Sequence, residues 1–419
     1  MFWASFEVIM NSENMTEKDI KQNTKKQESV SEQKFEFNTY FIYFFVVAIF
    51  VCMRIFTNVC NQYGVFSSLG VYGAYFLSVG LSIFTQVGIL LVVPFLLLKK
   101  TNKMNFKQTC AHYGFKKISW KSLLLCLVLG VSVFLLNIYC SNFFNSIIQY
   151  LGYRPSSGGS SLIPATWWTL VLDLLCTAVL PAFCEEALHR GMLMRGMSSL
   201  GMKKSILVSG LLFGLLHLNI EQFFYATIIG FFLGYLAYGS GSIYPCIIVH
   251  FMNNALSVFL SFARKMKWPI GNVISTFVNF IFRNHILGII IIFLLLILLL
   301  VLAFELTKCV FLDAFNQDFK RQQKQFATMA MRQQYFQSLE NIKDGAMSDR
   351  PVFVTKEDGV FVDSKEFLEF VQANIQEIVS KAGDMIKPQK MPIKSKILLW
   401  GSVALGLIIT IMTFIWGLL

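Results

Sequence analysis

Charged residues are scarce in this sequence. Lysine, arginine, aspartate and glutamate make up 14% of its 419 residues, whereas soluble globular domains carry about 25%. Apolar residues make up 55%. This composition excludes an ordinary soluble domain and predicts an integral membrane protein that crosses the bilayer several times.

The sequence also lacks patterns that would indicate other classes of protein. None of its nine cysteines forms a C-x-x-C pair, so we expect small buried hydrophobic residues rather than a disulfide framework or a thiolate metal site. The formal net charge of +12 comes without a pattern typical of nucleic-acid binding. Lysines cluster beside apolar runs, as expected where loops meet anionic headgroups. The lipid bilayer is therefore an expected partner, and nucleic acid is not.

Long apolar runs dominate the sequence instead. A helix needs about 20 mostly apolar residues to cross a bilayer. Such runs lie near 39–59, 72–98, 120–142, 165–198, 204–219, 222–239, 243–263, 285–305 and 397–419. The segment 268–282 is a further short span, a re-entrant piece or an interfacial helix. The pattern predicts an all-α fold, a polytopic transmembrane helical bundle of about eight or nine spans.

Polar side chains interrupt the apolar pattern at a few places within 165–263. They are Glu185, Glu186 and Arg190 in "FCEEALHRGML", His217 in "FGLLHLN", and His250 and Asn254 in "VHFMNN". Ionisable groups inside a membrane cost several kcal/mol unless they are paired or hydrated, so function is the default interpretation. Helical rise places Glu185, His217 and His250 at comparable depth.

Helical spacing separates the roles of these groups. Glu186 and Arg190 stand four residues apart with the acid first, the better orientation for an ion pair, whereas Glu185 is rotated by about 100° and has no such partner. A carboxylate next to an imidazole can take a proton from one trapped water. A second imidazole and an amide can donate to the oxyanion of a tetrahedral intermediate. This set of groups is sufficient for peptide hydrolysis inside a membrane.

In these motifs the chain resembles the CAAX protease and bacteriocin-processing (Abi) family, which includes the type II CAAX prenyl endopeptidases. The family pattern is E-E-x-x-x-R, then F-x-x-x-H, then H-x-x-x-N. The chain reads "EEALHR" at 185–190, "FGLLH" at 213–217 and "HFMNN" at 250–254, on separate predicted spans. The resemblance covers about residues 165–263.

The resemblance implies an intramembrane glutamate-type endopeptidase that hydrolyses a peptide bond of a membrane-bound or lipidated protein or peptide. By carry-over from the family, Glu185 and His217 activate the water, while His250 and Asn254 stabilise the oxyanion. The residues Glu186, Arg190 and Phe213 would support them. Neither a metal nor another cofactor is expected.

Two alternatives stay open. A glutamate and two histidines are also a frequent zinc set, so one alternative is a zinc-dependent version of the same protease, although H-E-x-x-H is absent. The other is a non-catalytic membrane scaffold or bacteriocin immunity protein. A composition rich in phenylalanine and lysine indicates a low-GC bacterium, and a bacterial cell membrane is the expected location.

The division of the chain follows from the spans and from the lysines. Seven lysines within 99–121 predict a cytoplasmic loop, which places the N-terminus on the cytoplasmic side. Four lysines just before the last span, at 387, 390, 394 and 396, place that segment on the same side. We expect a polar tail (1–38), N-terminal transmembrane helices (39–164), a catalytic transmembrane core (165–263), a linking segment with one helix (264–305), a cytoplasmic segment (306–396) and a C-terminal transmembrane anchor (397–419). The cytoplasmic segment is a candidate binding site for a protein partner.

Overall fold

The structure, a computed structural model, describes residues 17–154, 163–270, 293–314 and 391–418, with a few isolated residues between 276 and 360. Residues 17–31 are described as backbone only. The predicted segment 268–282 lies largely outside the described residues, and so does most of 306–396.

The described part of the chain is a bundle of membrane-length helices. Eight helices are long and apolar enough to cross a membrane: Glu32–Gln62, Ser67–Thr101, Trp120–Tyr150, Trp167–Gly196, Ile220–Ser240, Tyr244–Lys265, Phe293–Ala314 and Ile393–Leu418. The helix α10 (Gly201–Leu216) is apolar but has only 16 residues. Apart from two-residue antiparallel strands, β1 (Thr355–Lys356) and β2 (Gly359–Val360), the described elements are helical. The predicted all-α polytopic bundle is confirmed.

Several of these spans are built from more than one helical element. Up to residue 150 the elements are α2 (Glu17–Gln62), η2 (Ser67–Leu69), α3 (Gly70–Ile83), η3 (Phe84–Val92), α4 (Val93–Thr101), α5 (Phe106–His112) and α6 (Trp120–Tyr150). They are followed by α7 (Trp167–Leu174), η4 (Leu175–Val179), α8 (Leu180–Glu186), η5 (Ala187–Leu193), α9 (Met194–Gly196), η6 (Ser198–Leu200), α10, α11 (Ile220–Ser240), α12 (Tyr244–Lys265) and α16 (Ile393–Leu418).

Local sequence sets the helix boundaries around the central spans. The side chain of Thr166 accepts a hydrogen bond from the Thr169 backbone and starts α7, and Asn219 starts α11 in the same way through Glu221. These bonds satisfy N–H groups that have no partner within the helix. Gly241, at φ 64°, ends α11 in a left-handed conformation that suits glycine.

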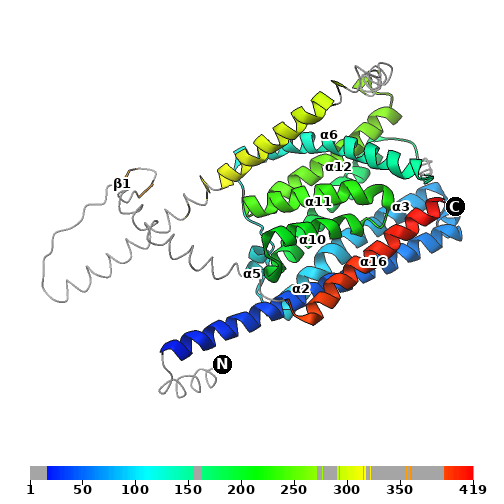
Figure 1. Cartoon of the computed structure of the whole chain (residues 1–419). Coiled ribbons are helices and arrows are strands. Elements are labelled where there is room, and N and C mark those ends of the chain that lie inside the picture. The colour runs from blue at the N-terminus through cyan, green and yellow to red at the C-terminus, as the bar shows by residue number, and fades with distance from the viewer. Residues whose placement is uncertain are drawn as a thin grey trace.

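The helices pack around two apolar clusters. One contains residues of α2, η3, η5, α10 and α16, and the other contains residues of α6, α11, α12 and the helix Phe293–Ala314. Figure 1 shows α10 and α11 side by side, α12 beside α6, and α16 along α2. The last helix is therefore packed into the bundle: Gly406 lies against Leu215 of α10, and the Thr413 hydroxyl accepts the backbone N–H of Ile220.

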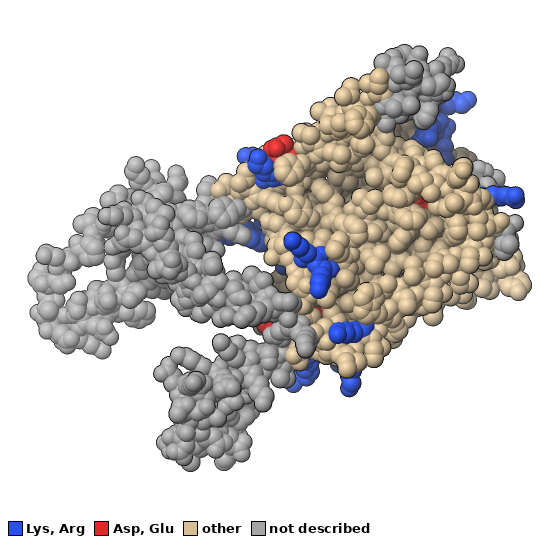
Figure 2. Space-filling model, viewed as in Figure 1, with Lys and Arg blue, Asp and Glu red and all other residues tan. Residues whose placement is uncertain are grey.

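The outer surface agrees with a bilayer environment. The face of the bundle visible in Figure 2 consists mostly of uncharged side chains, with lysine and arginine in a few isolated places. Large apolar residues such as Phe56, Phe143 and Trp416 are exposed on the surface. Such exposure is unfavourable in water but not in lipid. The chain is an integral, multi-pass membrane protein.

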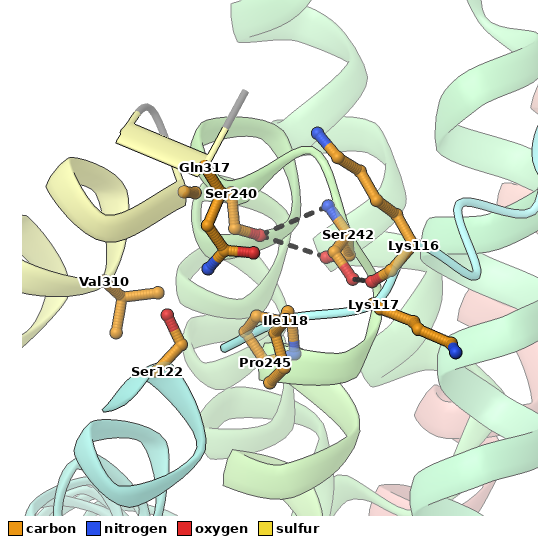
Figure 3. A pocket seen from close by; sticks show the side chains of 10 residues that line it. Lys116, Lys117, Ile118, Ser122, Ser240, Ser242, Pro245, Val310 and Gln317 are labelled. Carbon is orange, nitrogen blue, oxygen red and sulfur yellow. Dashed lines mark hydrogen bonds between the residues drawn. The ribbon is translucent and has the colours of Figure 1, made fainter. Parts of the chain in front are cut away.

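A small pocket lies where the turn between α11 and α12 meets the segment before α6. Figure 3 shows Ser240 and Ser242 bonded to each other there, and the Ser242 hydroxyl donates to the Lys116 carbonyl at 2.6 Å. None of the predicted site residues lines this pocket. Its hydrogen bonds tie two loops together at one end of the bundle.

A close glycine contact fixes the approach of α10 to α11. A Cβ atom added to Gly230 would lie 2.8 Å from the Cα of Gly210, so the backbones touch without intervening side chains, as small residues allow in membranes. This contact holds the helix that ends at His217 against α11.

We predict that Gly230→Ala lowers the stability of the bundle because the added methyl meets backbone that cannot yield, an overpacking cost of about 1–3 kcal/mol. Gly80→Ala is the matched control, since nothing lies within 4 Å of a Cβ there and alanine favours the helix. Thermal unfolding in detergent should give a lower midpoint for Gly230→Ala only. Equal midpoints for the two variants would contradict the close contact.

Candidate active site

The helix that carries the two glutamates is irregular on both sides of them. The elements η4 and η5 are π-helical and flank the α-helical turn α8; such segments occur frequently at functional sites. Pro181 begins this turn and has no N–H to donate to the carbonyl four residues earlier. That carbonyl, of Thr177, instead accepts a hydrogen bond from Nδ2 of Asn254 on α12, at 3.1 Å.

Glu186 is the centre of a buried ionic cluster. Its Oε1 accepts from Arg190 Nη1 at 2.9 Å and from His250 Nδ1 at 2.9 Å. Both Glu186 and Arg190 are fully buried. Arg190 also donates through Nη2 to the Gly230 carbonyl at 2.8 Å. Through Arg190 and His250, the Glu186 carboxylate thus links its own helix to α11 and α12. It also fixes the ring of His250, so that Nε2 points away from Glu186.

Phe213, the phenylalanine of the F-x-x-x-H motif, packs against the charged and aromatic groups of the site. The Arg190 guanidinium lies over it, with Cζ 4.5 Å from the ring centre, a favourable cation–π geometry. His217 and His250 contact the same ring edge to face, with centroids 5.3 and 5.5 Å away, and His189 does so at 5.2 Å. Phe213 therefore sets the relative positions of both motif histidines.

Glu185 has a different environment from its neighbour. Its Oε1 accepts a hydrogen bond from Gln86 Nε2 of η3 at 2.9 Å, and among the described residues no cationic side chain pairs with it. Its side chain is buried, with 9% of the residue exposed. His189, which bonds to the Glu185 carbonyl, contacts the same Phe213 ring as His217 and His250 do. The structure therefore brings Glu185, His217 and His250 into one neighbourhood.

The orientation of His217 makes one ring nitrogen available. Its Nδ1 lies 3.0 Å from the Phe213 carbonyl oxygen. A carbonyl only accepts, so Nδ1 carries the proton and Nε2 of the neutral ring has a lone pair. This is the tautomer that a proton acceptor needs.

Asn254, the fourth predicted residue, belongs to a chain of amides on α6 and α12. Asn137 donates to Asn253 at 3.0 Å, and Asn253 donates to Asn254 at 2.9 Å. Since Asn254 passes one N–H to Thr177, its orientation is fixed and one N–H remains for another acceptor. The structure thus places Asn254 one helical turn beyond His250, and its donated hydrogen bond goes to the span that carries the two glutamates.

Sequence reasoning missed two side chains that hold this neighbourhood together. Gln86 lies in the predicted span 72–98, and the sequence feature that could have singled it out is an amide among apolar residues. Tyr43 of α2 bonds through its hydroxyl to His189 Nε2 at 3.2 Å, and His189 Nδ1 lies 2.9 Å from the Glu185 carbonyl. His189 is therefore a buried structural group that links α2 to the turn carrying Glu185.

Among the residues that the structure describes, no three histidine, cysteine, aspartate or glutamate side chains are arranged to hold a metal ion. The carboxylate of Glu186 is already used by Arg190 and His250. The zinc-dependent alternative stays a prediction.

Comparison with known families supports the resemblance found in the motifs. A family model described as Type II CAAX prenyl endopeptidase Rce1-like matches residues 166–256, a range that includes all the predicted site residues. No curated protein and no solved structure matches the chain. The predicted resemblance to the CAAX protease family is confirmed over this range, and it supports a membrane protease of the CAAX type at the level of the family.

The two adjacent glutamates should differ sharply in their effect on stability. Glu186→Gln leaves the buried Arg190 without its counter-ion, and breaking a buried pair in this way costs about 3–5 kcal/mol. Glu185→Gln keeps an acceptor for Gln86 and disturbs no ion pair, so we expect a change below about 1 kcal/mol. The free energy of unfolding in mixed detergent micelles measures both. Equal losses would show that Glu186 has no special structural role.

Proposed function

We propose that residues 165–263 are the catalytic core of an intramembrane glutamate-type endopeptidase that hydrolyses a peptide bond of a membrane-bound or lipidated protein or peptide. The observation that carries the proposal is the difference between the two glutamates. Glu186 is paired with Arg190 and bonded to His250, whereas Glu185 has a neutral partner, Gln86, and lies in the neighbourhood of His217.

In this proposal Glu185 and His217 activate a water molecule. The Glu185 carboxylate takes one proton from the water, and the oxygen of that water attacks the carbonyl carbon of the substrate. Nε2 of His217 accepts a hydrogen bond from the same water and holds it in line for attack. Among the described residues no ion pair engages the Glu185 carboxylate, so it is available to take the proton.

The tetrahedral intermediate carries a negative oxygen that needs donors. His250 is held by Glu186 through Nδ1, so Nε2 lies on the opposite side of the ring. In this proposal the ring carries a proton on both nitrogens during the reaction, and Nε2–H is the first donor. The remaining N–H of Asn254 is the second donor. Preorganised donors of this kind contribute about 10²–10³-fold to the rate each. The proton on Glu185 then passes to the leaving nitrogen, the C–N bond breaks, and the products are a new carboxylate and a new amine.

A mutational series tests the proposal. The purified protein, reconstituted in liposomes, is given prenylated and unmodified membrane peptides, and the products are identified by mass spectrometry. Glu185→Gln removes the proton acceptor and should lower kcat/KM at least 10²–10⁴-fold, the contribution of a general base. Asp173→Asn is the matched control: Asp173 lies in the same span and accepts from the Tyr75 hydroxyl at 3.0 Å, which asparagine also does.

Three outcomes would contradict the proposal. Glu185→Gln retaining cleavage within tenfold of the unmodified protein removes the glutamate mechanism. Loss of cleavage with a chelator and its recovery with zinc favours the zinc-dependent alternative. Peptide binding without any cleavage favours the scaffold or immunity protein.

The composition rich in phenylalanine and lysine supports a bacterial cell membrane as the location.

A further inference from the structure

A polar cleft lies between the second half of α2 and the span formed by α3 and η3. Its volume is about 520 Å³. Seven of its lining side chains are uncharged polar groups: Thr57, Asn58, Asn61, Ser78, Ser82, Thr85 and Gln86. Polar groups inside membrane spans are expensive unless they face one another or a hydrated cavity. A row of them along one cleft therefore indicates a path for water or for a peptide backbone.

The inner end of the cleft reaches the proposed catalytic base. Gln86 lines the cleft and donates to Glu185. Its other amide atom, Oε1, is buried and has no hydrogen-bond partner among the described residues. A buried acceptor left without a donor costs about 1–3 kcal/mol. A peptide N–H arriving in the cleft would supply that donor next to Glu185.

Arg54 is the charged residue among those that line the cleft. It stands eight residues before the end of α2, about 12 Å along the helix axis, and no carboxylate pairs with it among the described residues. The cleft thus has Gln86, the partner of the proposed general base, at one end and an arginine without a counter-ion along its wall.

The spacing between Arg54 and Glu185 follows from helix contacts. Thr39 contacts Gly196 and Tyr43 bonds His189, so α2 runs antiparallel to the glutamate helix. Arg54 lies eleven residues beyond Tyr43, about 16 Å along the axis, whereas Glu185 lies about 6 Å from His189 in the same direction. The remaining 10 Å or so is the length of about three residues of extended chain.

We propose that the cleft receives one side of the substrate in extended form and that Arg54 binds a substrate carboxylate about three residues from the cleaved bond. Arg54 is then a specificity-determining residue of the reaction proposed above, on which this inference rests. An arginine forms charge-assisted, two-point hydrogen bonds to a carboxylate, and the unpaired guanidinium in the cleft matches that ligand. The carboxylate belongs either to the end of the substrate chain or to an acidic side chain.

Binding is tested in the Glu185→Gln background, where no peptide is consumed. Three fluorescent apolar peptides are compared in lipid nanodiscs: one with a free C-terminal carboxylate, its C-terminal amide, and an amide with glutamate at the last position. We expect at least one carboxylate peptide to bind about tenfold more tightly than the neutral amide, and which one does so identifies the source. Adding Arg54→Gln should remove this preference, and Arg54→Lys should keep part of it.

The control is Arg264→Gln, which removes an exposed arginine in the last turn of α12 and should leave the preference unchanged. In the protein with Glu185 intact, Arg54→Gln should raise KM for carboxylate substrates and leave the amide unaffected. Equal binding of all three peptides, no binding of any of them, or a preference that survives Arg54→Gln would overturn the inference. In that case an arginine that extends to the headgroups is the simpler account. Cleavage that depends on Glu185 would still support the proposed function.

Discussion

A carboxylate buried in an apolar bundle has to be neutralised, and the way Glu186 meets this requirement organises the site. Arg190 supplies the opposite charge one helical turn away, and His250 supplies a second donor from α12. Arg190 reaches α11 through the Gly230 carbonyl and lies over the ring of Phe213 on α10. Four helices are thus held around one ionic cluster, and removing either charge would leave the other unpaired in a medium of low polarity.

This arrangement leaves Glu185 available for chemistry. Adjacent residues on a helix point about 100° apart, so a structural glutamate and a reactive one can share a single turn without sharing partners. The π-helical segments on either side of the turn and Pro181 disturb the regular backbone. Side chains supply hydrogen bonds in place of the lost order: Asn254 of α12 binds the carbonyl of Thr177, and His189, itself bonded to Tyr43 of α2, binds that of Glu185. The turn that carries the two glutamates is therefore supported in part by α2 and α12.

Much of this organisation could be predicted from the sequence. Length and apolarity located the spans, and i, i+4 spacing correctly paired Glu186 with Arg190. The partners from distant helices could not be predicted, because Gln86, Tyr43 and Gly210 are ordinary residues whose importance depends on tertiary contact. The contact of His250 with Glu186, and the role of Asn254 at the carbonyl that Pro181 frees, likewise required the relative placement of α8 and α12.

The central claim is that Glu185 and His217 act on one and the same water molecule. A double-mutant cycle on kcat/KM tests it most directly, with Glu185→Gln, His217→Gln and the double variant measured against the unmodified protein. Groups that act as a unit are strongly non-additive, so the account predicts that the double variant is no slower than the slower single variant. Losses that multiply, as for two independent sites, would contradict it.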